Sequence, residues 1–94
     1  MPYFALIYDL VPDYLERRAP LRGQHLALAT QAYARRELIL AGAFSDPPDK
    51  ALLVFQSADK TVAESFAKND PYVLNGLVRH WQVRSWNVVV GDSK

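Results

Sequence analysis

Hydrophobic residues recur with two different periods along this 94-residue chain, and the periods predict four strands and two main helical regions. Short runs rich in aliphatic and aromatic residues, bounded by turn-forming residues, are typical of buried strands. Such runs occupy residues 3–10, 38–44, 51–56 and 81–90. Helical spacing is found over residues 13–37, as a short turn and then a helix from about Pro20, and over residues 60–68. The order β-α-β-β-α-β predicts an α+β fold of the ferredoxin-like class, with an antiparallel sheet and both helices on one face.

The last predicted strand is apolar on both of its faces, because Trp81, Trp86 and residues 88–90 fall at even and odd positions alike. The helices cover one face of the sheet, so the other face needs a cover as well. A chain of this length buries only about 60–65% of its unfolded surface, which leaves a thin core. We therefore expect a homodimer in which the sheets of two subunits face each other.

One ionisable residue interrupts the apolar face of the first long helix. At about 100° per residue, six apolar residues share one arc. They are Leu21, Leu26, Leu28, Ala29, Ala32 and Tyr33. His25 falls near the centre of this arc, and Arg22 and Arg18 align with it one and two turns earlier. This pattern predicts a pocket between helix and sheet, open where the helix begins and suited to an anionic or phenolic ligand.

A simpler interpretation of the same residues stays open. A lone histidine on an apolar face is more often a core residue whose nitrogens are satisfied by neighbours. Arginines in the first turns of a helix can extend their charged ends to solvent. The alignment of Arg18, Arg22 and His25 on one line is the observation that favours the pocket.

Asp70, Pro71 and Tyr72 form the second group of interest. Asp is a preferred N-cap and Pro a preferred first helical residue, so local structure alone explains the Asp-Pro pair. Asp70 can also hold His25, because a carboxylate on one imidazole nitrogen fixes the tautomer and leaves the other nitrogen as a base. Tyr72 can offer a hydroxyl to the same site. On the functional interpretation, His25 and Asp70 are the candidate catalytic residues, and Arg18, Arg22 and Tyr72 are the candidate substrate-binding residues. The structural interpretation stays open beside it.

Composition excludes several functional classes. Eleven basic and ten acidic residues leave a net charge of +1, which provides no basic face for nucleic acid. Without cysteine there is no thiolate chemistry, and the two histidines show no metal-ligand spacing. No apolar run spans a bilayer, and the N-terminal residues lack the basic region of a signal peptide. We expect one cytoplasmic domain over residues 1–94, without metal, cofactor, nucleic-acid or membrane partner.

Four stretches carry a resemblance to a known family: the strand ending in Asp9, "LERRAPLRGQHLALA", "LILAGAF" and "AKNDPYVLNGLVRHWQVRSW". Their most specific elements are the R-x-x-H of Arg22 and His25, the Ala41-Gly42 pair and the D-P-Y of residues 70–72. Over nearly its whole length the chain resembles the YciI-like (YCII-related) family. It departs from the family pattern at Ala43, where proline is frequent, and at residues 85–86, where a Pro-aromatic pair is common.

The resemblance implies a ferredoxin-like subunit that dimerises through its sheets, the dimeric α/β barrel arrangement, with an active site built on His25 and Asp70. The family's chemistry is poorly defined, and a dehydrochlorinase acting on a chlorinated hydroxyquinol is among its suggested activities. One hypothesis is an enzyme that takes a proton from a small anionic or phenolic substrate, in an elimination, isomerisation or tautomerisation. The alternative is a non-catalytic small-ligand-binding or accessory protein with the same pocket. A cofactor-free monooxygenase ranks below both.

Overall fold

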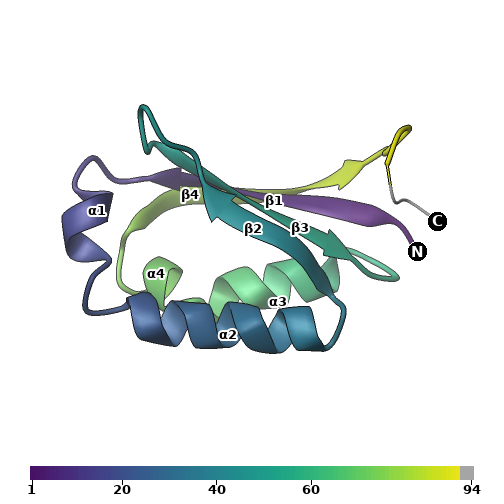
Figure 1. Ribbon diagram of the computed structural model, residues 1–94, viewed down its shortest axis with the longest axis horizontal. Coiled ribbons are helices and arrows are strands. Elements are labelled where there is room, and N and C mark those ends of the chain that lie inside the picture. Colours follow the sequence, from purple (N-terminus) through teal and green to yellow (C-terminus); the bar gives the residue numbers. More distant parts are fainter. Residues whose placement is uncertain (92–94) are drawn as a thin grey trace.

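A four-stranded antiparallel sheet with helices on one face makes up the computed structural model, which describes residues 1–91 (Figure 1). In chain order the elements are β1 (Tyr3–Leu10), α1 (Tyr14–Arg17), α2 (Arg22–Ala34), β2 (Leu38–Ala43), β3 (Lys50–Gln56), α3 (Thr61–Asn69), α4 (Pro71–Leu74) and β4 (Val78–Trp86). The strands lie in the order β2-β3-β1-β4. The fold is therefore the ferredoxin-like α+β fold that the order of elements predicted, with two additional short helices.

Alternation along β1 decides which of its side chains reach the helices. Phe4, Leu6, Tyr8 and Leu10 are buried, and the residues between them are half-buried on the opposite face. Leu6, Tyr8 and Leu10 pack with apolar residues of β3, α3 and α4 into one core. Even positions of β1 can therefore contact side chains from the helices, and odd positions face the uncovered side of the sheet.

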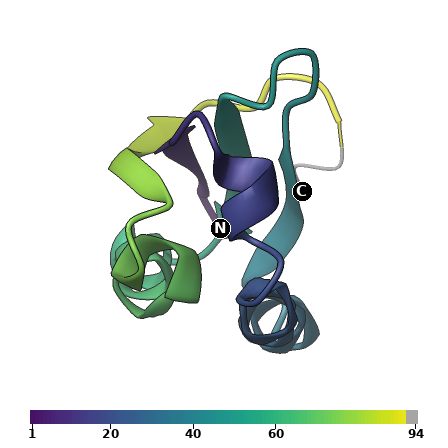
Figure 2. The same cartoon turned by 90° about the vertical axis from the view of Figure 1, so that its left-hand side faces the viewer.

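The two longer helices lie side by side beneath the sheet, α2 against β2 and α3 against β1 and β4 (Figure 2). The short helix α1 lies at the end where α2 begins, and α4 follows α3 directly. α1 and the start of α2 thus lie at the same end of the sheet as α4, which is distant from them in the sequence. Among the described residues, none of the helices has the length and apolar character needed to cross a membrane.

The predicted range of the last strand was wrong at both ends, since β4 runs from Val78 to Trp86 and not over residues 81–90. β4 pairs with β1, and Trp86 lies opposite Tyr3, the first residue of β1. Pro2 has no backbone N–H to continue the ladder. The valines at 89 and 90 are exposed and lie beyond the strand. The apolar character of residues 88–90 therefore does not contribute to the sheet.

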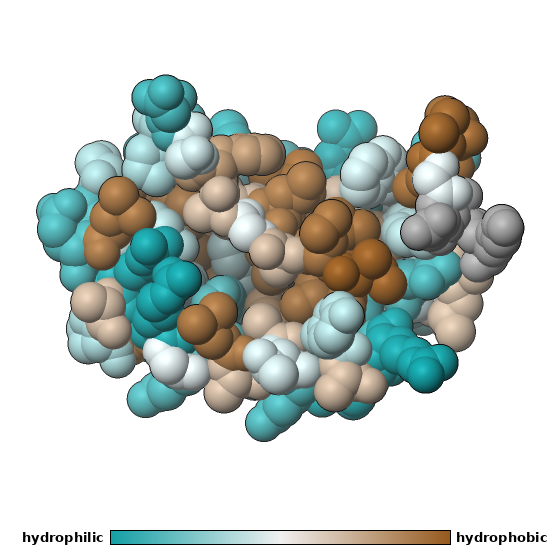
Figure 3. Space-filling model, in the orientation of Figure 1, coloured by the Kyte–Doolittle hydropathy of each residue, from teal (hydrophilic) through white to brown (hydrophobic). Residues whose placement is uncertain are grey.

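The first long helix begins later than predicted and buries less of its apolar arc. α2 starts at Arg22, and Pro20 lies in the turn that precedes it. Ala32 is buried, whereas Leu26 and Tyr33 are 45% and 65% exposed. The reason is that α2 packs under β2, an edge strand, so the sheet does not extend over the outer side of the helix. Figure 3 shows hydrophobic side chains gathered at the surface near this edge strand, β2, above α2.

Candidate functional site

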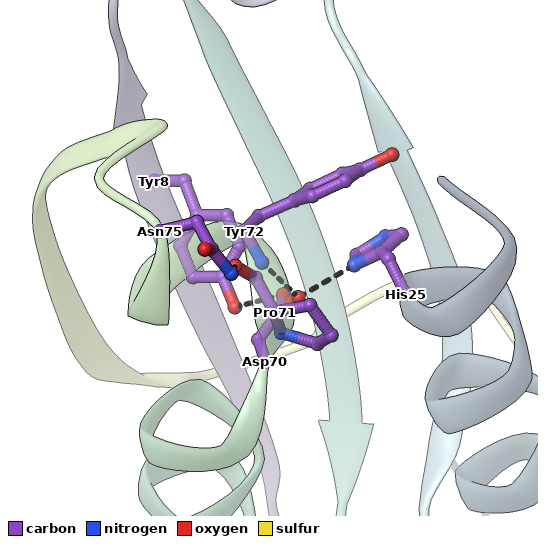
Figure 4. A network of polar contacts seen from close by, with 6 residues as sticks. All are labelled: Tyr8, His25, Asp70, Pro71, Tyr72 and Asn75. Carbon is purple, nitrogen blue, oxygen red and sulfur yellow. Dashed lines mark hydrogen bonds and ion pairs between the residues drawn. The ribbon is translucent and has the colours of Figure 1, made fainter. Parts of the chain in front are cut away.

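Asp70 is the buried centre of a hydrogen-bond network that joins β1, α2 and α4 (Figure 4). His25 Nδ1 lies 2.8 Å from Asp70 Oδ1. The backbone N–H of Tyr72 donates to the same oxygen at 3.0 Å, and the Tyr8 hydroxyl donates to Oδ2 at 2.7 Å. Burying a carboxylate costs free energy unless the group is hydrogen-bonded, and these donors provide the hydrogen bonds. The predicted contact between His25 and Asp70 is present, and Asp70 also caps α4.

The carboxylate determines how the His25 ring presents its two nitrogens. An ionised carboxylate only accepts hydrogen bonds, so in the neutral ring Nδ1 carries the proton and Nε2 keeps its lone pair. Figure 4 shows the second nitrogen facing away from Asp70. The ring is stacked on Tyr72, with centroids 3.9 Å apart and planes 8° apart, and meets Phe66 edge-on. Its basic nitrogen therefore has a defined direction.

His25 lies on the wall of a cavity of about 370 Å³ between α2 and the sheet. Arg18, Arg22 and Tyr72 line the same cavity. Much of the remaining wall consists of aliphatic and small residues from α2, β2 and β3. The His25 side chain is 15% exposed, so it is reached through the cavity, whereas Asp70 lies behind it and is fully buried. The volume falls at the lower end of the range for small-ligand pockets, about 300–1,000 Å³.

Two arginines give the cavity wall a positive charge. Within residues 1–91 neither Arg18 nor Arg22 forms an ion pair. The Arg18 guanidinium lies 5.3 Å from the centroid of the Tyr14 ring, a cation–π distance. Burial raises the pKa of Tyr72, and the charges of Arg22 and Arg18 act in the opposite direction, as they would on any phenol within their electrostatic reach. The wall is thus suited to an anionic ligand.

Two tyrosines contribute to the site although the sequence did not single them out. Burial, and then the charge and hydrogen bond of Asp70, raise the pKa of Tyr8 far above its ordinary value, so Tyr8 acts as a neutral donor. Tyr14 packs edge-on against Tyr72, with centroids 5.7 Å apart. A tyrosine on the buried face of a central strand signals a need for a hydrogen-bond partner. Nothing in the sequence identifies that partner as Asp70.

Other candidate positions lie outside this network. His80 is exposed on β4, and Asp9 forms an ion pair with Lys50 across β1 and β3. A hollow of about 440 Å³ between α2 and α3 has Arg35 and Glu37 on its wall, and these two bind each other at 3.0 Å. Within the described part of the chain, no group of three or more His, Asp or Glu side chains is arranged to hold a metal ion. The cavity beside His25 is therefore the candidate site.

Comparison with known sequences identifies one family and one relative. A family model described as the YCII-related domain matches residues 1–87. An uncharacterized protein of Haemophilus influenzae is 32% identical, and the match covers 80% of this chain and 86% of that protein. No activity is attached to that relative.

Comparison with solved structures identifies proteins of the same fold. The 5-chloro-2-hydroxyhydroquinone dehydrochlorinase TftG of Burkholderia phenoliruptrix, in complex with 2,5-dihydroxybenzoquinone, has a TM-score of 0.75 at 20% identity, over 90% of this chain and 93% of TftG. A NIPSNAP family protein of Agrobacterium tumefaciens has a TM-score of 0.59 at 14% identity, over 97% and 93% of the two chains. An antibiotic biosynthesis monooxygenase has a TM-score of 0.56 at 13% identity, over 96% and 100%. At these identities the likeness shows the fold alone.

Proposed function

The chain belongs to the YCII-related domain family, and on this premise we propose that it is an enzyme of small-molecule metabolism that moves a proton with the pair His25 and Asp70. The observation that carries the proposal is the orientation of the His25 ring. Nδ1 is bound to a buried carboxylate, and Nε2 is turned away from it on the wall of a cavity that also holds two arginines. This is the arrangement that a general base requires.

In the proposed reaction, Nε2 of His25 removes a proton from a small anionic or phenolic substrate. The imidazolium that forms is stabilised by the carboxylate of Asp70, already at hydrogen-bond distance. Arg18 and Arg22 lie where they can offset negative charge on the substrate. Elimination, isomerisation and tautomerisation need only proton transfer and charge stabilisation from the protein. TftG, which shares the fold, is a dehydrochlorinase, and loss of a proton and a chloride is one form of such an elimination.

The test is hydrogen exchange catalysed by the protein in D₂O. Small phenols and enolisable acids are incubated with the wild-type protein, and the loss of each C–H signal is followed by NMR. We expect at least one compound to exchange, and His25→Asn to abolish the exchange. His80→Asn is the matched control, because His80 is exposed on β4 and lies outside the network. Binding of a compound without exchange in the wild-type protein would instead favour the non-catalytic binding protein.

We propose further that the enzyme is a homodimer whose two sheets face each other. The helices cover only one face of the sheet (Figure 1). On the other face a hollow of about 300 Å³ is lined by the apolar residues Ala5, Ile7, Leu52 and Trp86 together with Arg84 and Ser85. Exposed apolar surface of this kind is typical of an interface, and a second copy of the same sheet offers a face of matching character.

A further inference from the structure

The hydroxyl of Tyr72 is the buried side-chain polar atom for which the described residues provide no hydrogen-bond partner. Tyr72 is only 2% exposed, so bulk water does not satisfy this group freely. Buried hydroxyls in native proteins are nearly always hydrogen-bonded, and an exception needs an explanation. Tyr72 lines the cavity beside His25, and the cavity is where a partner can enter.

The direction of this hydroxyl is set by the same carboxylate that orients the base. The backbone N–H of Tyr72 and Nδ1 of His25 bind one oxygen of Asp70, and the two rings stack at 3.9 Å. Tyr14 holds the Tyr72 ring from its edge. Figure 4 shows the hydroxyl at the end of the ring remote from Asp70. The Tyr72 hydroxyl, as the donor, and the His25 ring, as the base, are therefore held in a constant relative position on one cavity wall.

The charge around Tyr72 suits a negatively charged oxygen. Burial, followed by the neighbouring Tyr14, raises the pKa of Tyr72, so the phenol keeps its proton and can donate it in a hydrogen bond. Arg22 and Arg18 bring positive charge to the same wall. A neutral donor flanked by cations in a site of limited water access is the arrangement that stabilises an oxyanion.

We propose that Tyr72 donates a hydrogen bond to the substrate oxygen on which negative charge develops when His25 removes a proton, and that the substrate is a compact phenol or enolisable carbonyl compound. This inference rests on the proposed function and names its substrate class. The proton of the substrate C–H or O–H bond passes to Nε2 of His25. The electron pair of that bond ends on the conjugated oxygen, as an enolate or phenolate held by Tyr72. No oxidant or reductant is needed.

The experiment measures binding of 4-nitrophenol and of 4-nitrotoluene, which has the same ring with a methyl group in place of the hydroxyl. Tyr72→Phe keeps the ring that stacks on His25 and removes only the hydroxyl. We expect this variant to bind 4-nitrophenolate about tenfold more weakly or worse, the usual loss for a hydrogen bond to a charged group. Its affinity for 4-nitrotoluene and its melting temperature should stay at the wild-type values. Tyr33→Phe, at an exposed tyrosine of α2, is the control.

A pH series separates this role from a structural one. In the wild-type protein, bound 4-nitrophenol should ionise at a lower pH than free 4-nitrophenol, and Tyr72→Phe should reduce that difference. The proposal is overturned if the wild-type protein does not bind the phenolate, if Tyr72→Phe binds it as tightly, or if that variant loses thermal stability. Failure of the proposed function has another signature: hydrogen exchange in D₂O would not depend on His25, while the effect of Tyr72→Phe on phenolate binding would persist.

Discussion

At the scale of single residues, Asp70 has two tasks that the same carboxylate performs together. It caps α4 through the backbone N–H of Tyr72, and it orients His25. Oδ1 serves both of these partners, and Oδ2 serves Tyr8. The structural and the functional interpretation of the Asp-Pro pair are therefore both compatible with the geometry, because an N-cap can face a site.

Removing the Tyr8 hydroxyl tests how much the buried carboxylate depends on this donor. Tyr8→Phe leaves Oδ2 of Asp70 short of a partner in a buried place, so we expect the free energy of unfolding to fall by about 1–3 kcal/mol. Tyr33→Phe, at an exposed position, should change it by less than about 0.5 kcal/mol. Urea unfolding measures both variants. Equal effects of the two substitutions would mean that Oδ2 finds another donor.

The tautomer of His25 is a second prediction at this scale. When the ring is neutral, the proton should reside on Nδ1 and leave Nε2 unprotonated, because Asp70 accepts from Nδ1. Long-range ¹⁵N–¹H NMR spectra distinguish the two tautomers directly. His80, which is exposed, provides the comparison within the same spectrum. A neutral ring with its proton on Nε2 would contradict the proposed base.

At the scale of elements, α4 is a four-residue helix that presents both Asp70 and Tyr72, and its two ends hold it in place. Asp70 caps its first turn, and Pro71 occupies the first helical position. At its other end Gly76 adopts a φ of 79°. The N–H of Leu77 then donates to the carbonyl of Tyr72 at 2.9 Å, and the N–H of Gly76 to that of Val73 at 3.2 Å. This is a Schellman motif, and it fixes the helix that carries the site.

Substituting Gly76 tests this helix end. The added Cβ of Gly76→Ala would meet only Arg17 Nη2, at an ordinary 3.7 Å, so its cost comes from the positive φ. We expect a loss of about 1 kcal/mol of stability. Gly23 lies in α2, and a Cβ added there meets nothing within 4 Å. We therefore expect Gly23→Ala to stabilise the protein by about 0.5–1 kcal/mol. Changes of the same sign in thermal unfolding would refute the argument.

At the scale of the whole molecule, the two faces of the sheet have different roles. The cavity, the His25–Asp70 pair and the core lie on the helix side. The opposite side has half-buried apolar residues such as Ile7 and Leu52, which lie opposite each other in β1 and β3. A sheet covered on one face by helices leaves its other face to solvent or to a second subunit.

The proposed dimer predicts the effect of a charge on the uncovered face. Ile7→Glu places carboxylates where two sheets would meet, so we expect a dimer in the wild-type protein and a folded monomer in this variant. Leu15→Glu, at an exposed position of α1, should leave the dimer unchanged. Light scattering at micromolar concentration reports the mass, and circular dichroism confirms folding. A well-folded wild-type monomer under these conditions would exclude the dimer.

The features that the sequence determined by itself are those with a local cause. Strand alternation and helical spacing arise from neighbouring residues, so the order of the elements was predictable. The Asp-Pro start of α4 was predictable for the same reason, since capping acts over two or three residues. The inward direction of His25 followed from the helical period. The range of β4 was not predictable in this way, because a strand ends where its partner ends.

The features that only the tertiary structure decided depend on which distant segments meet. β4 stops at Trp86 because it has no partner beyond the start of β1. Leu26 is exposed because α2 lies beneath an edge strand. Helical periodicity predicts the apolar side of a helix but does not predict which strand covers it. Tyr8 and Asp70 are 62 positions apart, and His25 and Asp70 are 45 apart. His25 was predicted as a partner of Asp70 because both residues carry chemistry that fits a pair. A hydrogen bond acts over about 3 Å of space and leaves no pattern in the spacing of the sequence, so Tyr8 was identified as the second side-chain partner of Asp70 only in the folded chain.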